Sequence, residues 1–196
     1  MTTHYRRTLP HLHPPGAALF LTARLAGSLP QAVLEELRPA TPDPADHRQR
    51  FARYEQQLET GGYGPTWLGH PAVAALVLAG LHQQATSGHY ELLAACVMPN
   101  HLHVVLRLPE LTSEPFFRVL QRFKSATALG ANRQLGRTGK FWQEETYDHA
   151  VRENQSDALV RVVRYTAHNP VKAGLCSAWH KWAGTYVAPE WQELVG

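Results

Sequence analysis

The chain has 196 residues, of which 44% are apolar and 18% charged, so it can bury a core and is too apolar to be disordered. Its apolar runs are too short to cross a bilayer, and prolines interrupt the region where a signal peptide needs its apolar segment. Its two cysteines exclude a disulfide scaffold and a four-cysteine zinc module. These features predict a cytoplasmic protein with no membrane partner.

The net charge of +3 is modest, but fifteen of the nineteen basic residues are arginine, which suits bidentate contacts with phosphate. Two basic stretches, 118–140 and 161–181, contain no acidic residue. Such stretches indicate either a polyanionic partner or a solvated surface. The candidate phosphate-binding residues are Arg118, Arg122, Lys124, Arg161, Arg164 and Lys172.

Hydrophobic periodicity and turn residues divide the chain into alternating elements. In order, they predict an extended arm (1–16), a strand (17–25), a short helix (31–38), a helix capped by Asp46 (46–59), a helix (71–86), two strands (90–98 and 101–108), a basic amphipathic helix (116–132), a strand (141–151) and a helix from Ser156 that ends at Asn169-Pro170. Two consecutive strands between helices predict an α+β fold, with a ferredoxin-like antiparallel sheet and helices mainly on one face. We expect one domain over 17–182 and a C-terminal tail over 183–196.

The segment His101-Leu102-His103 lies in a predicted strand, where a spacing of two places both imidazoles on one face, about 6.5–7 Å apart at the backbone. Two such imidazoles can bind one divalent ion. In a chain with twelve histidines, however, a pair at this spacing also arises by chance. Arg107 shares the histidine face, which argues against a core face, and the basic helix that follows is expected to lie beside the histidines.

The last predicted helix carries Tyr165 and Asn169 four residues apart and therefore on one face. The Asn169 side-chain oxygen can bind a hard cation, and Tyr165 can present a phenol beside it. The alternative is a half-buried core tyrosine followed by a helix C-cap. Nearby arginines, and the lack of acids between 157 and 190, predict surroundings that favour a phenolate at Tyr165, whereas Asp148 opposes one at Tyr147.

Four segments, in this order and spacing, resemble the REP-associated tyrosine transposases, small bacterial members of the HUH single-tyrosine transposase superfamily. The segments are MPNHLHVVL, FKSATA, GKFWQEETYDHAVRE and RYTAHNPVKAGL, and the N-terminal HLHPPGAALFLTARLAGSLP resembles the family's first-strand region. The likeness covers about residues 5–182 and implies a catalytic domain that uses Mg²⁺ or Mn²⁺ and nicks single-stranded DNA near hairpins. It makes His101, His103 and Asn169 the metal ligands and Tyr165 the nucleophile. Thr166 and the long loop at 39–46 depart from the family pattern.

The function implied is a metal-dependent endonuclease and strand transferase that forms a 5′-phosphotyrosine, as a monomer or a homodimer. A non-catalytic hairpin-binding repressor on the same fold remains an alternative. A histidine-triad hydrolase is disfavoured because position 105 is valine instead of a third histidine. An RNA-binding domain would show aromatic side chains on the sheet, where this strand shows His101, His103 and Arg107.

Overall fold

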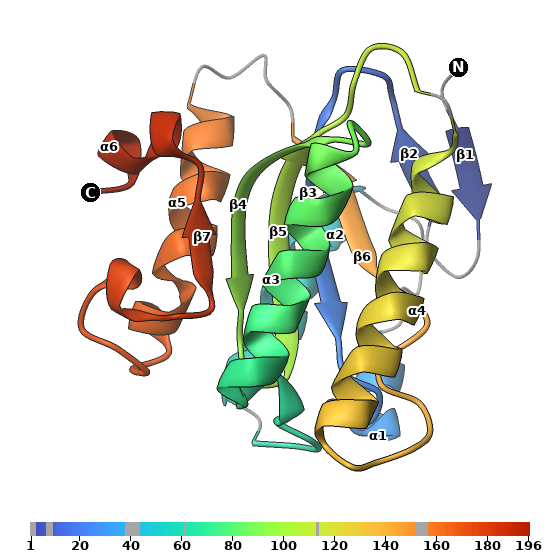
Figure 1. Cartoon of the computed structure of the whole chain (residues 1–196), viewed down its shortest axis with the longest axis vertical. Helices are drawn as coiled ribbons and strands as arrows, with labels where there is room; N and C mark the ends of the chain where they lie inside the picture. The colour runs from blue at the N-terminus through green and yellow to red at the C-terminus, as the bar shows by residue number, and fades with distance from the viewer. Residues whose placement is uncertain (1–2, 7–9, 38–43, 61, 113, 152–156) are drawn as a thin grey trace.

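A computed structural model of the chain describes residues 3–6, 10–37, 44–60, 62–112, 114–151 and 157–196. Its centre is a five-stranded antiparallel sheet in the order β6-β3-β5-β4-β7 (Figure 1). The strands are β3 (Ala18–Arg24), β4 (Glu91–Val97), β5 (His101–Arg107), β6 (Tyr147–Ala150) and β7 (Thr185–Val187). The α+β class and the antiparallel sheet predicted from the sequence are therefore confirmed.

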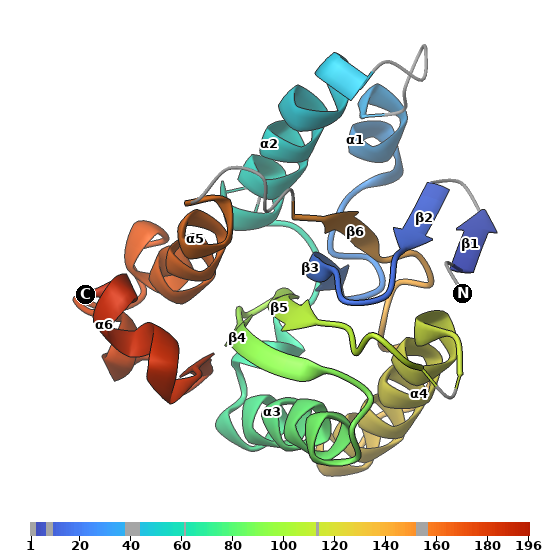
Figure 2. The same cartoon turned by 90° about the horizontal axis from the view of Figure 1, so that it is seen from above.

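Helices cover both faces of this sheet, as the view from above shows (Figure 2). α3 and α4 lie side by side on one face, whereas α2 and α5 lie on the other. The α-helices are α1 (Gln31–Glu36), α2 (Pro44–Thr60), α3 (Pro71–Thr86), α4 (Phe116–Gln134), α5 (Ala158–Lys172) and α6 (Gln192–Val195), and the 3-10 helices are η1 (Trp67–Gly69), η2 (Trp179–Lys181) and η3 (Pro189–Trp191). The helices are thus more evenly divided between the faces than the sequence predicts.

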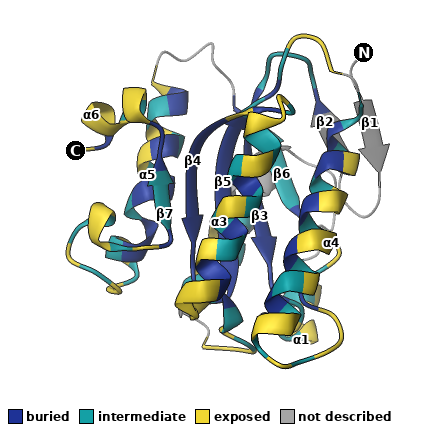
Figure 3. Cartoon of the chain, viewed as in Figure 1, coloured by how far each residue is buried: buried dark blue, intermediate teal, exposed yellow. Residues whose placement is uncertain are grey.

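Alternating side chains of β5 enter two different cores. Leu102, Val104 and Leu106 pack in the cluster under α3 and α4. Val105 packs with Phe20 and Val163 in the cluster under α5. The histidines share this second face, and both are completely buried, so the prediction that it is not a core face is wrong. The β5 ribbon is accordingly coloured as buried (Figure 3). Arg107 does not contradict this burial, because it is the last residue of the strand and is partly exposed.

β4 has strands on both sides, β5 and β7, and every residue after its first is buried. This confirms the prediction that a nearly continuous apolar run forms an interior strand covered on both faces. β7 comes from the segment predicted to be a C-terminal tail, and it pairs with β4 through Ala94, Ala95 and Cys96. Residues beyond 182 therefore complete the sheet.

The strand predicted over 141–151 is shorter in the structure. Only Tyr147–Ala150 pairs continuously with β3, and Trp142 forms a single bridge with Leu25. The Lys124 ammonium of α4 explains the interruption, because it donates to the Gln143 and Glu144 carbonyls and to Thr146 Oγ1, at 2.6, 3.0 and 2.8 Å. These bonds hold the 143–146 segment against α4, although the Gln143 N–H still donates to the Arg24 carbonyl of β3 at 2.8 Å.

α5 does not end at Pro170, as the sequence predicts, but continues to Lys172. Pro170 lacks an N–H and removes one helical hydrogen bond. The next turn forms nonetheless, because the Ala173 N–H donates to the Asn169 carbonyl at 2.9 Å. As a result, Lys172 lies on the same helix as Tyr165 and Asn169.

The N-terminal segment predicted to be an extended arm contains two paired strands, β1 (Thr3–Arg6) and β2 (Pro10–His13). α2 begins at Pro44, so Asp46 lies inside the helix and not at its cap. Most of the predicted loop at 39–46, together with Ser156, lies outside the described residues. Among the helices that the structure describes, none is long and apolar enough to cross a membrane.

Candidate functional site

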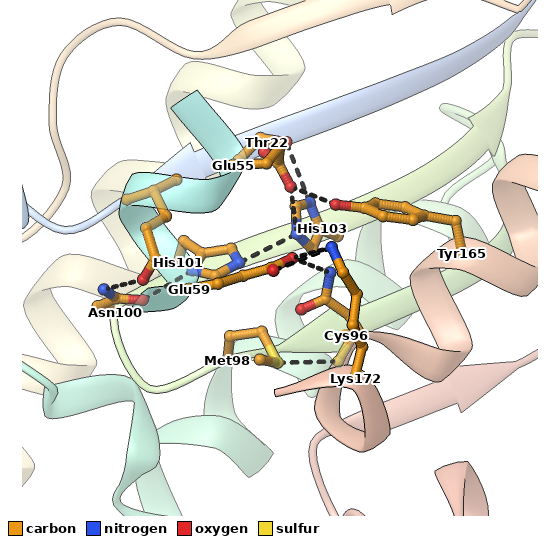
Figure 4. A network of polar contacts seen from close by, with 12 residues as sticks. Thr22, Glu55, Glu59, Cys96, Met98, Asn100, His101, His103, Tyr165 and Lys172 are labelled. Carbon is orange, nitrogen blue, oxygen red and sulfur yellow. Dashed lines mark hydrogen bonds and ion pairs between the residues drawn. The ribbon is translucent and has the colours of Figure 1, made fainter. Parts of the chain in front are cut away.

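β5 brings the imidazoles of His101 and His103 together beneath α2 and α5 (Figure 4). Their Nε2 atoms lie 3.0 Å apart, and both side chains are 0% exposed. The sequence prediction that the two rings converge is therefore correct. Leu102, between them, points into the opposite core and fixes the strand in register.

A carboxylate from α2 completes this cluster. Glu55 Oε2 lies 3.0 Å from His103 Nε2, and Glu55 Oε1 accepts a hydrogen bond from Thr22 Oγ1 at 3.2 Å. His101, His103 and Glu55 form a buried group whose ligand atoms could hold a metal ion. Glu55 was not predicted from the sequence, because no motif links this helix to the histidine strand. The available signal was weak: Glu55 and Glu59 are one turn apart on an otherwise ordinary helix.

Hydrogen bonds fix how the two rings present their nitrogen atoms. Asn100 Nδ2 donates to the Leu58 carbonyl, so Asn100 Oδ1 accepts from His101 Nδ1 at 2.7 Å. Thr22 donates its hydroxyl proton to Glu55, so its oxygen accepts from His103 Nδ1 at 3.0 Å. Each Nδ1 therefore carries a proton, and each Nε2 faces the centre of the cluster.

Three acceptors consequently meet at about the same point: two Nε2 atoms and one carboxylate oxygen. Such an arrangement requires a cation among them, either a proton on His103 Nε2 or a metal ion bound by all three groups. Burial, followed by the neighbouring His103, lowers the pKa of His101 to about 3, so His101 is neutral at physiological pH. Neutral imidazole and carboxylate are the ligand types that divalent transition metals bind. The donor set therefore fits a metal.

Tyr165 of α5 enters the cluster through the same carboxylate oxygen. Its hydroxyl donates to Glu55 Oε2 at 2.7 Å, although the two residues are 110 positions apart. Burial, then the charges of Glu55 and Glu59, raise the pKa of Tyr165. The prediction that its surroundings favour a phenolate is thus wrong, because the relevant acids come from α2 and are distant in sequence.

Asn169 lies one turn beyond Tyr165 and is completely buried. Its Nδ2 donates to Glu59 Oε1 at 3.4 Å, while its Oδ1 is buried and has no hydrogen-bond partner among the described residues. A buried amide oxygen without a donor is available to a cation. The role of Asn169 as a ligand stays a prediction, and this oxygen is the atom that would fulfil it.

The basic residues of α4 lie on the wrong side of the sheet for the role first expected of them. α4 packs on the face opposite the histidines, so its charges are not beside the metal cluster. Arg118 is exposed, Arg122 forms a bidentate pair with Glu114 at 2.5 Å, and Lys124 binds the 143–146 segment. Their binding of DNA stays a prediction, at a place remote from Tyr165.

The basic residues of α5 lie on the histidine side. Arg161 and Arg164 are exposed, and Arg164 also donates to the Leu194 carbonyl at 2.8 Å. Lys172 pairs with Glu59. Of the two basic helices, α4 and α5, it is therefore α5 whose charged side chains can reach a phosphate beside Tyr165.

The competing tyrosine, Tyr147, occupies β6 opposite Thr22 and stacks on Phe51 with ring centroids 4.4 Å apart. Thr22 pairs in turn with His103, so Tyr147 lies on the histidine face, two strands from that residue. Of these two tyrosines, Tyr165 is the one whose hydroxyl donates to Glu55.

A histidine pair on a central antiparallel strand, facing a tyrosine on α5, is the arrangement that the resemblance to single-tyrosine transposases led us to expect. Comparison with known proteins supports this class. The chain is 29% identical over 107 residues to a Haemophilus influenzae protein named as a REP-associated tyrosine transposase; the match covers 50% of this chain and 60% of that protein. No family model matches the chain.

A solved structure shares the fold. It is described as a REP-associated tyrosine transposase bound to a REP hairpin, and it superposes with a TM-score of 0.54 at 19% identity, covering 93% of this chain and 81% of that one. The resemblance predicted from the four motifs is thereby confirmed. The chain spans about 60% of the length of the curated relative that it matches.

Proposed function

We propose that this protein is a metal-dependent enzyme that nicks and rejoins single-stranded DNA near hairpins through a covalent link to Tyr165. The observation that carries this proposal is the shared oxygen of Glu55, which contacts both the Tyr165 hydroxyl and His103 Nε2. Nucleophile and metal cluster are therefore joined by one atom. The named relatives, one of them bound to a REP hairpin, support hairpin DNA as the substrate class.

One group of residues would hold the metal ion, and a second group orients these ligands. His101, His103 and Glu55 would hold Mg²⁺ or Mn²⁺, with Asn169 Oδ1 as a further oxygen ligand. A bound divalent ion would polarise the scissile phosphate and offset the negative charge that builds on its oxygens. Thr22 and Asn100 keep both imidazoles in the tautomer that presents Nε2.

The reaction is an exchange of ester bonds at phosphorus. Tyr165 Oη forms a bond to phosphorus as the bond from phosphorus to the 3′ oxygen breaks, which leaves a 5′-phosphotyrosine and a free 3′-hydroxyl. Glu55 Oε2 accepts the Tyr165 O–H in a hydrogen bond and is placed to receive its proton, and a proton from solvent completes the 3′-hydroxyl. The 3′-hydroxyl of a second strand can reverse the exchange, so joining requires no nucleotide cofactor.

The test is a denaturing gel of the protein incubated with a labelled hairpin-flanked oligonucleotide and Mn²⁺. We expect a protein-linked DNA band that is absent after addition of EDTA. His103→Ala should remove the band and leave binding of the oligonucleotide largely intact, because affinity comes mostly from contacts with phosphates. Binding without any adduct in the wild-type protein would support the repressor alternative.

A further inference from the structure

α2 carries a second carboxylate, Glu59, one helical turn after Glu55. Glu59 Oε1 accepts from Lys172 Nζ at 3.1 Å and from Asn169 Nδ2 at 3.4 Å, and Glu59 Oε2 lies 3.0 Å from the same ammonium (Figure 4). The Glu59 side chain is 8% exposed, whereas that of Lys172 is 57% exposed. The anion is thus nearly enclosed, while its main cationic partner remains open to solvent.

Both donors belong to α5 and lie on the side of the helix that carries Tyr165. Asn169 follows Tyr165 by four residues and Lys172 follows it by seven, a spacing that stacks side chains along one face. Lys172 Nζ lies 5.6 Å from the centre of the Tyr165 ring. An anion bound between these two donors would consequently lie next to the nucleophile.

Carboxylate and phosphate present the same kind of acceptor to such donors. Each has oxygen atoms that take charge-assisted hydrogen bonds from an ammonium and ordinary ones from an amide N–H. A strand whose scissile phosphate lies at Tyr165 would bring a neighbouring phosphate within reach of these donors. Glu59 therefore occupies a position that suits a DNA phosphate.

We propose that Lys172 and the Asn169 amide form a phosphate subsite beside the nucleophile, and that Glu59 fills this subsite until DNA displaces it. The inference rests on the proposed function, because it takes single-stranded DNA as the ligand. It uses Asn169 through Nδ2 and leaves Oδ1, which is buried and has no hydrogen-bond partner within the described part of the chain, available to a cation. In the DNA-free protein, Glu59 of α2 therefore occupies the subsite. A strand must displace this carboxylate in order to bind there, which lowers the affinity of the protein for DNA.

A double-mutant cycle on oligonucleotide binding tests the subsite. Fluorescence anisotropy with a labelled single-stranded oligonucleotide, in EDTA, compares the wild type with Glu59→Gln, Lys172→Met and the double variant. Glu59→Gln should bind about two- to fivefold more tightly, because a neutral amide competes less with phosphate for an exposed ammonium. The gain should vanish in the Lys172→Met background, and Lys172→Met should reduce the salt slope by about 0.7.

Two further variants separate the subsite from other effects. Glu91→Gln removes the same charge at the first residue of β4, which pairs with Arg107, four residues or about 13 Å along β5 from His103. It should leave affinity unchanged. Lys172→Arg keeps a positive charge and should preserve the gain from Glu59→Gln. Circular dichroism verifies that every variant is folded.

If Glu59→Gln raised the affinity for the oligonucleotide equally with and without Lys172, the carboxylate would act only by long-range repulsion of the DNA, and the subsite would be refuted. The absence of any increase in affinity would refute it as well. The outcome also distinguishes this inference from the proposed function. A wild-type protein that binds no oligonucleotide contradicts both. A wild-type protein that forms the adduct, with a Glu59→Gln variant that binds no more tightly, contradicts the subsite alone.

Discussion

The rings of His103 and Tyr165 lie edge to face, with centroids 5.7 Å apart, although one belongs to a central strand and the other to a C-terminal helix. Glu55 contacts the polar atoms of both residues. Tyr165 therefore already lies at the His101, His103 and Glu55 cluster in the DNA-free protein, and its hydroxyl is held by a carboxylate. The nearby acids stabilise the neutral phenol, so on the proposed function the proton would pass to Glu55 only as the Tyr165 oxygen bonds to phosphorus.

Tyr165→Phe should abolish the covalent adduct while fold and DNA affinity remain. The change removes only the hydroxyl and its 2.7 Å bond to Glu55. Tyr147→Phe should keep most of the activity, because that ring packs by stacking on Phe51. The measurement is adduct yield on a denaturing gel, followed by mass mapping of the linked peptide. An adduct on Tyr147 in the Tyr165→Phe protein would refute the assignment.

Thr22→Val should weaken metal binding about 10- to 100-fold, the usual effect of losing a residue that orients a ligand. The substitution keeps the shape of the side chain, but it removes the hydroxyl that accepts from His103 Nδ1 and donates to Glu55. Titration with Mn²⁺, followed by the increase in Tm, measures the effect. Thr185→Val is the matched control, since its hydroxyl contacts Cys96 in β4 instead. Equal Tm increases in both variants would contradict the assigned role of Thr22.

The basic residues of α4 and α5 should act on different parts of the DNA. A strand of about six nucleotides in the site should lose affinity when Arg161 and Arg164 become glutamine. It should be insensitive to the same change at Arg118 and Arg122, because α4 lies across the sheet. An oligonucleotide with an attached hairpin should respond to both pairs. Anisotropy across salt concentrations tests this, and equal effects of both pairs on the short strand would disprove it.

Stability should fall as the pH drops from about 6.5 toward 3, in part because of His101. Burial, followed by His103, lowers the pKa of His101 to about 3, whereas the unfolded chain titrates near 6.5. Between these values the unfolded state binds more protons, so acid favours unfolding. His101→Gln should therefore show a shallower loss of Tm over this range in metal-free buffer. A slope identical to that of the wild type would show that His101 does not titrate in this way.

The sequence predicted most of the sheet because its strands have clear patterns. The alternation of His101 to Arg107 and the apolar run before it gave β5 and β4 almost to the residue. β6 was predicted too long because an interaction distant in sequence, that of Lys124 with the 143–146 segment, interrupts its pairing. Such tertiary contacts leave no periodic signal.

The candidate site was predicted only where its residues form a local motif. His101 and His103 are two residues apart, and Tyr165 and Asn169 are four apart, so spacing alone brought each pair together. Glu55 and Glu59 reach the site through the docking of α2, which no short pattern encodes. The error about the charge around Tyr165 has the same origin: counting acids along the chain omitted those that the fold brings close.

The segments that make up the site are produced far apart in time during synthesis. A ribosome completes Glu55 and the histidine strand well before Tyr165, which lies 110 residues after Glu55. Until α5 is released and docks, the nascent chain can bring His101, His103 and Glu55 together but has no Tyr165 beside them. On the proposed function, a copy of the gene cut short before this helix would therefore encode a protein that lacks the nucleophile for DNA cleavage.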